Sequence, residues 1–188
     1  MKNNPITVGF DDATFKLKSQ SLKTKLIGVI CQGVRVVNVV QADITIDGND
    51  GTKILINLVK NLSNSVQFIL THTITFGGFN IIDLDQIYSE LKIPIIAINE
   101  RKVNLDAVIQ ALKQKYPDNY RKKFQTISNA GQLFQLEVPT AGGISHIYFH
   151  SKGIDVESVK SLLLKVSIDA KIPECLRVAH LVGRLYKH

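Results

Sequence analysis

Two runs rich in β-branched residues, separated by only two residues, constrain the fold of this chain more than any other feature. The runs KLIGVIC (25–31) and VRVVNVVQADITI (34–46) flank Gln32-Gly33, a pair that suits a hairpin turn. A shorter apolar run, Ile6 to Phe10, precedes them. We therefore expect three consecutive antiparallel strands. An all-parallel sheet is excluded here, because a parallel connection needs a crossover far longer than two residues.

Beyond Thr52 the apolar residues recur every three or four positions, which predicts helices alternating with short buried strands. The expected elements are helices near 54–62, 84–91 and 105–112, strands at 66–70 and 93–98, a hairpin at 132–138 and 144–150, and helices at 156–166 and from 173 to 185. Three antiparallel strands followed by alternating helices and strands is the ribonuclease H-like order, a mixed α/β sheet with flanking helices. With no repeat and no linker, residues 1–188 are expected to form one such domain.

The charge balance favours a partner that carries phosphates. The chain has 23 Lys and Arg against 16 Asp and Glu, a net charge of +7, and a basic surface attracts nucleic acid through counterion release. No apolar stretch is long enough to span a membrane, and the first ten residues are too polar for a secretory signal. We expect a cytoplasmic protein with no membrane partner, and the sequence identifies no protein partner.

The stretch VGFDD (8–12) ends an apolar strand in two adjacent carboxylates. Burying two like charges side by side is costly unless a cation neutralises them. In a ribonuclease H-like sheet the carboxyl end of the first strand lies at the centre of the sheet. We therefore predict that Asp11 is a metal ligand and that Asp12 lies beside it in the same acidic pocket.

A second acidic group, in DITIDGND, contains Asp43, Asp47 and Asp50. The two-residue period of a strand places Asp43 and Asp47 on one face, and Asp50 begins the next helix, where it can either cap or ligate. We predict that Asp47 and Asp50 join Asp11 in binding Mg²⁺ or Mn²⁺, which oxygen ligands suit. Two such ions, about 4 Å apart, would orient a water and stabilise the leaving oxygen of a phosphodiester.

Three further side chains are candidates for the same chemistry. Asp83 begins a helix, as a cap or as part of the acidic pocket. His72 ends the fourth expected strand, as a ligand, a proton carrier or a core histidine. On the last helix His180 shares a polar face with Arg177 and Arg184, and this face suits either solvent or phosphate.

Two segments are candidates for contact with nucleic acid. The loop TFGGFN (75–80) permits close backbone approach to a ligand, although a simple tight turn explains it equally well. A basic run at 113–123 is interleaved with Tyr116 and Tyr120, which suits a backbone clamp with stacking rings and also an ordinary surface helix. The predicted nucleic-acid contacts are Gly77, Gly78, Phe79, Asn80, Lys113, Lys115, Arg121, Lys122 and Lys123.

Four stretches, VGFDDATF, ITIDGNDGTKI, ITFGGFNIIDL and PECLRVAHLVGRLY, together resemble the mainly archaeal endonuclease dU family, formerly a UPF0215-type domain of unknown function. The resemblance covers nearly the whole chain and implies a distant relative of endonuclease V that nicks DNA at deoxyuridine. On this pattern Asp11 matches the first-strand metal ligand, Asp47 or Asp50 the second acid, and His180 a late-helix histidine. Where endonuclease V has its third acid, this chain has Thr71-His72, and Asp83 can substitute.

The sequence thus predicts a DNA-repair endonuclease that uses Mg²⁺ or Mn²⁺ to cleave DNA near deaminated bases. Its expected partner is DNA in deaminated or single-stranded regions. Two alternatives stay open: a nucleic-acid-binding protein of the same fold without catalysis, and a nuclease acting on inosine or RNA. The predicted catalytic residues are Asp11, Asp12, Asp47, Asp50, His72, Asp83 and His180.

Overall fold

The computed structural model describes residues 2–15, 22–62 and 65–186. The strands are β1 (Ile6–Asp12), β2 (Lys23–Gln32), β3 (Arg35–Thr45), β4 (Phe68–His72), β5 (Thr75–Phe76), β6 (Asn80–Ile81), β7 (Ile95–Asn99), β8 (Phe134–Thr140) and β9 (Gly143–Lys152). The helices are α1 (Gly51–Lys60), α2 (Leu84–Leu91), α3 (Leu105–Lys115), α4 (Tyr120–Asn129), α5 (Val156–Val166) and α6 (Glu174–Gly183).

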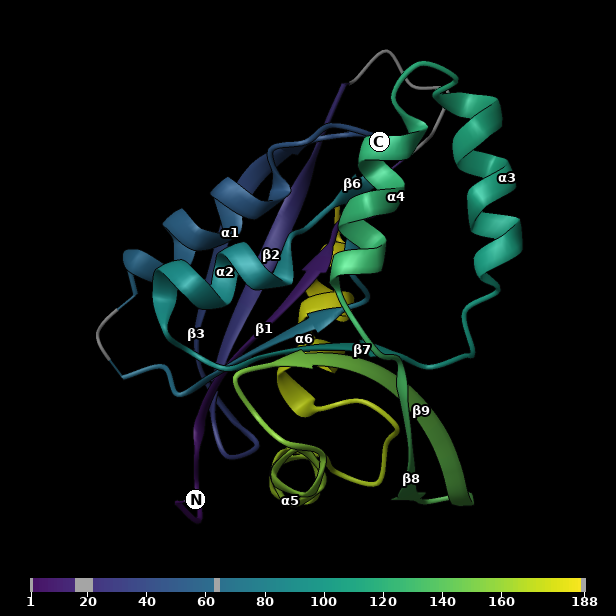
Figure 1. Ribbon diagram of the computed structural model, residues 1–188. Coiled ribbons are helices and arrows are strands. Elements are labelled where there is room, and N and C mark those ends of the chain that lie inside the picture. Colours follow the sequence, from purple (N-terminus) through teal and green to yellow (C-terminus); the bar gives the residue numbers. More distant parts are fainter. Residues whose placement is uncertain (1, 16–21, 63–64, 187–188) are drawn as a thin grey trace.

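Within these ranges, seven strands form one sheet in the order β3-β2-β1-β4-β7-β9-β8, and β5 and β6 pair separately (Figure 1). The first three strands are antiparallel, as the two-residue turn requires. β1, β4 and β7 run parallel to one another, and β9 returns antiparallel to β7. The expected mixed α/β sheet is confirmed. Its consequence for function is that the carboxyl ends of β1, β4 and β7 meet at one edge.

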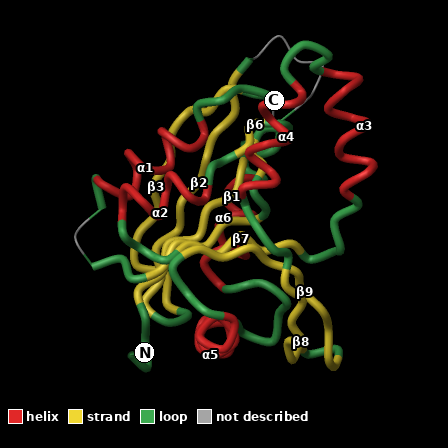
Figure 2. Tube along the Cα trace, in the orientation of Figure 1, coloured by secondary structure: helices red, strands yellow, loops and turns green. Residues whose placement is uncertain are grey.

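Helices cover both faces of the sheet, so that the strands form a middle layer (Figure 2). One hydrophobic cluster packs α1 to α4 against the sheet, and a second packs α5 and α6 against the opposite face. The buried strand β7 shows the two-sided pattern directly: Ile95 and Ala97 belong to the first cluster, whereas Ile96 and Ile98 belong to the second. None of the helices in the described ranges is long and apolar enough to cross a membrane.

Three elements, the short strands β5 and β6 and the helix α4, are absent from the prediction. The expected glycine loop TFGGFN lies in the small β5–β6 hairpin. The segment 120–129, whose start was interpreted only as part of a basic run, forms α4. Tyr120, Phe124 and Ile127 follow the helical period and pack against the first hydrophobic cluster. The basic residues between them are the feature that the prediction used instead.

A candidate metal centre and its surroundings

The ends of β1, β4 and α6 bring one carboxylate and two imidazoles together. The Asp11 side chain is only 4% exposed, and its two oxygens face different histidines. Oδ2 lies 2.9 Å from Nδ1 of His180, and Oδ1 lies 3.3 Å from Nδ1 of His72. One ligand atom from each residue lies within 4.8 Å of the other two. No lysine or arginine in the described ranges pairs with Asp11; its carboxylate meets these two rings and the Asp12 N–H, which donates to Oδ1 at 3.0 Å.

The fold explains why these three residues meet. β1 and β4 are parallel neighbours, with Phe10 opposite Thr71, so the residues that follow them, Asp11 and His72, lie side by side. α6 approaches β1 through two glycines. A Cβ on Gly9 would lie 2.7 Å from the Cys175 backbone, and one on Gly183 would lie 2.8 Å from the Asp12 carbonyl oxygen. This close packing places His180, near the end of α6, over Asp11.

The charges around this cluster interact strongly. The hydrogen bond to Asp11 raises the pKa of His72 above its usual value, although burial opposes this. Burial and the neighbouring Asp11 charge raise the pKa of Asp12 to about 6. Asp12 still has one strong partner, because the Gly77 N–H donates to its Oδ2 at 2.6 Å. The two adjacent carboxylates therefore differ: Asp11 faces imidazoles, and Asp12 holds the 75–80 loop.

The donor set formed by Asp11, His72 and His180 fits a divalent cation. A nearly buried carboxylate with two imidazole nitrogens is a mixed oxygen and nitrogen set, which suits transition metals such as Mn²⁺. Mg²⁺ prefers oxygen ligands and water, so the imidazoles make it the less suitable ion. The predicted role of Asp11 and the ligand interpretation of His72 therefore converge on one possible metal site.

Glu100 and Arg101 are neighbours of this cluster that the prediction does not include, and Arg184 was predicted only as part of the polar face of the last helix. Glu100, directly after β7, places Oε1 3.5 Å from Nε2 of His72. Arg101 lines a hollow with His72 and Glu100, and Arg184 lines another with Asp11, Asp12 and both histidines. The signal for Glu100 is present in the sequence, because NER follows the buried run IPIIAI just as the aspartates follow VGF.

The second acidic group lies outside this cluster. Asp47 adopts a left-handed backbone (φ 58°) in the turn after β3. Its Oδ2 pairs with Nζ of Lys115, and its Oδ1 accepts the Phe79 N–H at 2.9 Å. Burial opposes ionisation, but these donors together lower the pKa of Asp47. Asp43, further back on β3, forms an exposed ion pair with Lys25 at 2.7 Å.

Asp50, Asn80 and Asp83 also have structural partners. Asp50 accepts the Thr45 hydroxyl at 2.7 Å and the Asn80 amide at 2.6 Å, which lower its pKa against the effect of burial. Asn80 is fully buried, and its Oδ1 accepts the Gly51 N–H. Asp83 caps α2 by accepting the Gln86 N–H. A metal or catalytic role for Asp47, Asp50 and Asp83 stays a prediction, and these contacts give each carboxylate another explanation.

The glycine loop connects the two acidic groups. Gly77 donates its N–H to Asp12, and its carbonyl oxygen accepts the Asp47 N–H at 2.7 Å. Gly77 and Gly78 both have positive φ, and a Cβ on Gly78 would overlap Oδ1 of Asp47. The loop is therefore a tight turn that packs closely against Asp12 and Asp47.

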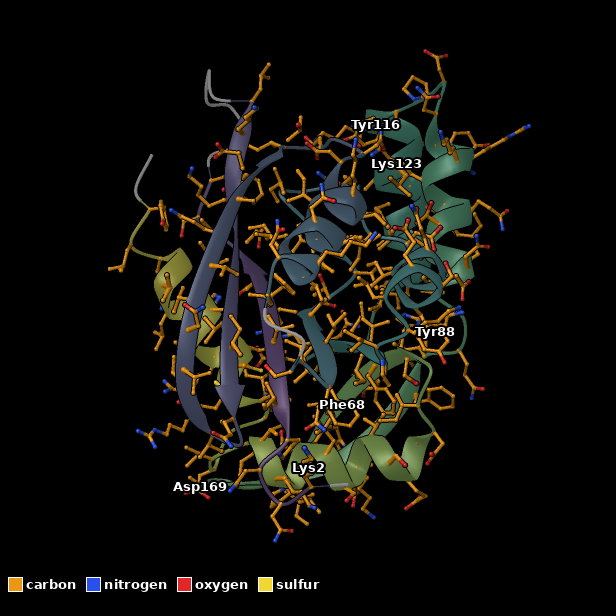
Figure 3. The ribbon with its side chains drawn as sticks, turned by 90° about the vertical axis from the view of Figure 1, so that its left-hand side faces the viewer. Lys2, Phe68, Tyr88, Tyr116, Lys123 and Asp169 are labelled. Carbon is orange, nitrogen blue, oxygen red and sulfur yellow. The ribbon has the colours of Figure 1, made fainter. Side chains whose placement is uncertain are left out.

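The basic run divides into internal and exposed residues. Lys123 is only 7% exposed, and its ammonium contacts the carbonyl oxygens of Phe79, Gly48 and Asp47 and the side chain of Asn49. It lies 5.0 Å from the ring centre of Tyr116, on the α3–α4 side of the molecule (Figure 3). By contrast, the predicted contact residues that remain exposed and without an acidic partner are Lys113, Arg121 and Lys122.

A cavity of about 310 Å³ opens beside the candidate metal centre. Its walls are mostly apolar, from the β4–β5 connection, α3 and α4, and include Phe79 of the glycine loop. Asn99 and His150 are buried polar residues of its lining. Thr73 and Asn99 also line the hollow that contains His72 and Glu100, so the cavity adjoins the cluster.

Solved structures with this architecture are similar over most of the chain. A protein of unknown function from Archaeoglobus fulgidus matches with a TM-score of 0.81 and 27% identity, over 95% of this chain and 96% of that one. Human ENDOV matches with a TM-score of 0.60 and 12% identity, over 96% and 83%. Ciona intestinalis endonuclease V, solved with a 24mer DNA containing an inosine, matches with a TM-score of 0.59 and 11% identity, over 94% of this chain and 83% of that one. The likeness to endonuclease V shows the shared fold.

Sequence relatives are archaeal and nearly equal in length. A UPF0215 protein of Thermococcus gammatolerans is 36% identical over 94% of this chain and 89% of the relative. A UPF0215 protein of Methanocaldococcus jannaschii is 34% identical over 98% of this chain and 95% of the relative. The model of the family described as endonuclease dU matches residues 6–186. The chain therefore belongs to the endonuclease dU family.

Proposed function

We propose that this protein is a metal-dependent endonuclease that hydrolyses a DNA phosphodiester near deoxyuridine, as part of DNA repair. Family membership and the endonuclease V-like fold support a nuclease. The observation that carries the metal dependence is the nearly buried Asp11 carboxylate, whose oxygens face two imidazoles and no lysine or arginine. The family description supports deoxyuridine as the target.

Asp11, His72 and His180 would hold the metal, and Mn²⁺ suits these ligands better than Mg²⁺. When bound, the ion would supply positive charge against a phosphate oxygen and lower the pKa of a bound water. Glu100 orients His72 through Nε2 while Nδ1 faces Asp11, a support typical of metal-binding histidines. Asp12 holds the glycine loop against the end of β1 through Gly77.

Arginines and lysines around the cluster would bind the DNA backbone. Arg184 and Arg101 line the two hollows next to His72, and Lys113, Arg121 and Lys122 are exposed on α3 and α4. The net charge of +7 supports such contacts. The DNA complex of Ciona endonuclease V supports nucleic-acid binding by this fold.

The cavity beside the cluster would receive the damaged base. Enzymes that act at a base extrude it from the stack, and they read it in a pocket with apolar walls and a few polar groups. Phe79 of the TFGGFN loop, one of the predicted nucleic-acid contacts, lines this cavity, so the loop would form part of the wall around the base. A volume of about 310 Å³ lies within the range of small-ligand pockets.

The direct test is a nicking assay on a labelled duplex with one deoxyuridine, together with the undamaged duplex. We expect cleavage with Mn²⁺, weaker cleavage with Mg²⁺ and none with a chelator. Asp11→Asn should abolish this cleavage. Asp43→Asn is its matched control and should cleave normally, because Asp43 is an exposed carboxylate that pairs with Lys25 away from the cluster. Salt-sensitive binding without cleavage under any divalent ion would instead identify a non-catalytic binding protein. Preferential cleavage of inosine or RNA substrates would identify the other alternative.

A further inference from the structure

Two buried polar residues share one face of neighbouring strands in the cavity beside the metal cluster. Asn99 on β7 and His150 on β9 are each 9% exposed, and both line the cavity. Ala97 lies directly opposite His150, and Asn99 lies two residues further along the same strand. The two side chains are therefore diagonal neighbours on one face, within reach of a single planar ligand.

The hydrogen bond of His150 determines which ring nitrogen carries the proton. Nδ1 lies 3.1 Å from the carbonyl oxygen of Gln132, and a carbonyl oxygen only accepts, so Nδ1 is the protonated nitrogen. Burial lowers the pKa of His150, so the ring is neutral near pH 7. Nε2 is then an acceptor only.

Within the described residues the side-chain amide of Asn99 forms no hydrogen bond, and the His150 ring forms its hydrogen bond to Gln132 through Nδ1, with the backbone of Gly131 as a second polar neighbour. In the described residues the fully buried polar side-chain atoms without a partner belong to Thr7 and Tyr116, so Asn99 and His150 remain open to the cavity that they line. Two such groups among the apolar walls of one cavity indicate a ligand that provides an N–H for His150 and a complementary polar group for Asn99.

We propose that Asn99 and His150 read the edge that deamination creates on a base: a ring N–H beside a carbonyl. Uracil presents N3–H with O4, and hypoxanthine presents N1–H with O6. Nε2 accepts the ring N–H, and the Asn99 amide donates to the adjacent carbonyl oxygen. Cytosine and adenine present a bare ring nitrogen at that position, so two lone pairs would face each other.

This inference rests on the proposed function for its DNA substrate, but it concerns recognition and not cleavage. Thymine presents the same edge as uracil, and guanine presents the same N1–H and O6 as hypoxanthine, so this pair separates deaminated bases from cytosine and adenine alone. A mismatched base is extruded at lower cost than a paired one, and this difference favours uracil opposite guanine over thymine opposite adenine.

The test measures binding of labelled oligodeoxycytidine strands with one central uracil, hypoxanthine, N3-methyluracil or cytosine. The protein carries Asp11→Asn to prevent cleavage, Mn²⁺ is present, and fluorescence anisotropy gives the Kd. We expect uracil and hypoxanthine to bind about tenfold more tightly than cytosine. N3-methyluracil should bind like cytosine, because methylation removes the N–H that His150 accepts.

Two substitutions separate the nitrogens of His150. His150→Asn keeps a donor near the position of Nδ1 and removes Nε2, so the preference should fall below about threefold. His150→Gln places an amide near the position of Nε2 and should keep more of the preference for uracil over cytosine. Equal affinity of all variants for the all-cytosine strand shows that they fold.

Equal binding of uracil and N3-methyluracil would overturn the inference, as would an unchanged preference in His150→Asn. The N3-methyluracil comparison needs no substitution at position 150, so the test stands even if that variant does not fold. Failure of the proposed function is a different result: no nicking by the unsubstituted protein under any divalent ion, with the edge preference in binding intact.

Discussion

Asp11 and Asp47 begin from similar sequence contexts, since each follows an apolar strand pattern and has a second aspartate nearby. In the structure Asp11 is nearly buried and faces two histidines. Asp47 is balanced by Lys115 and the Phe79 N–H, and it joins the β3–α1 turn to α3. The difference lies in the neighbours: a carboxylate paired with lysine is neutralised, whereas one between imidazoles can still bind a cation.

The largest expected effect is that of Asp11→Asn on catalysis. Removing the carboxylate should lower the single-turnover nicking rate by about 10³-fold, because a metal ion contributes several kcal/mol to such reactions. DNA binding should remain measurable by anisotropy. A normal nicking rate in this variant, or the same catalytic loss in Asp47→Asn, would contradict the assignment of the metal site to Asp11 and not to Asp47.

The next largest effect concerns stability, at the lysine that joins α4 to the turn. Lys123→Met leaves three carbonyl oxygens and the Asn49 side chain without their shared donor. We expect a loss of about 3 kcal/mol, because buried acceptors that lose a charged donor are left unsatisfied. The melting temperature, followed by circular dichroism, should fall by roughly 6–12 °C. Lys122→Met, at an exposed neighbour on the same helix, should change it little.

A smaller stability effect is expected for Asp47→Asn. The amide keeps an acceptor for the Phe79 N–H and tolerates positive φ, so only the ion pair with Lys115 is lost. The Lys115 side chain is 40% exposed, and solvent screening reduces the expected loss to about 1 kcal/mol or less. Calorimetry of Mn²⁺ binding should give the unsubstituted affinity. A large loss of Mn²⁺ affinity in this variant would show that Asp47 is a metal ligand.

The smallest expected effect is on how folding stability changes with pH, measured on metal-free protein. The sign of this change should differ between the Asp47–Asp50 region and the Asp11–His72 cluster. The pKa values of Asp47 and Asp50 are lowered in the folded state, so their stabilisation is present above the unfolded value of 3.8 and decreases as pH falls through the folded values. The pKa of His72 is raised, so its stabilisation is complete below the unfolded value of 6.5 and is lost as pH rises through the folded value.

Melting curves from pH 3 to 9 with a chelator would test both signs. His72→Gln should remove the part of the loss that begins above pH 6.5 and leave the acid limb unchanged. Asp50→Asn should reduce the acid limb. A stability profile in which His72→Gln alters only the acid limb would contradict the assignment of the raised pKa to contact with Asp11.

Much of the fold was predictable because its signals are local. The β-branched runs with a two-residue turn identified β2 and β3, and the apolar periods identified α1, α2, α3, α5 and α6. α4 was missed although Tyr120, Phe124 and Ile127 recur at helical spacing, because its basic residues dominated the interpretation. The burial of Lys123 was not predictable, since it depends on carbonyl groups in a distant turn. A charged residue in sequence gives no indication that such acceptors are near.

The candidate site was predictable only in part. Asp11 was identified because two adjacent carboxylates at a strand end need neutralisation, and His72 and His180 were candidates with open roles. Glu100 was missed, although the parallel order of β4 and β7 brings the strand end that precedes it next to His72. Asn99 and His150 were missed because their shared face depends on the pairing of β7 with β9, which no local pattern specifies.

By itself, the amino-acid sequence determined the succession of strands and helices and the strand-end position of Asp11, because hydrophobic periodicity and turn length act over a few neighbouring residues. Only the tertiary structure decided which aspartates keep their charge available. Asp11 meets histidines 61 and 169 residues away, and Asp47 meets a lysine 68 residues away. Partners at such separations are chosen by strand order and helix packing, and their charges decide whether a carboxylate supports structure or binds a cation.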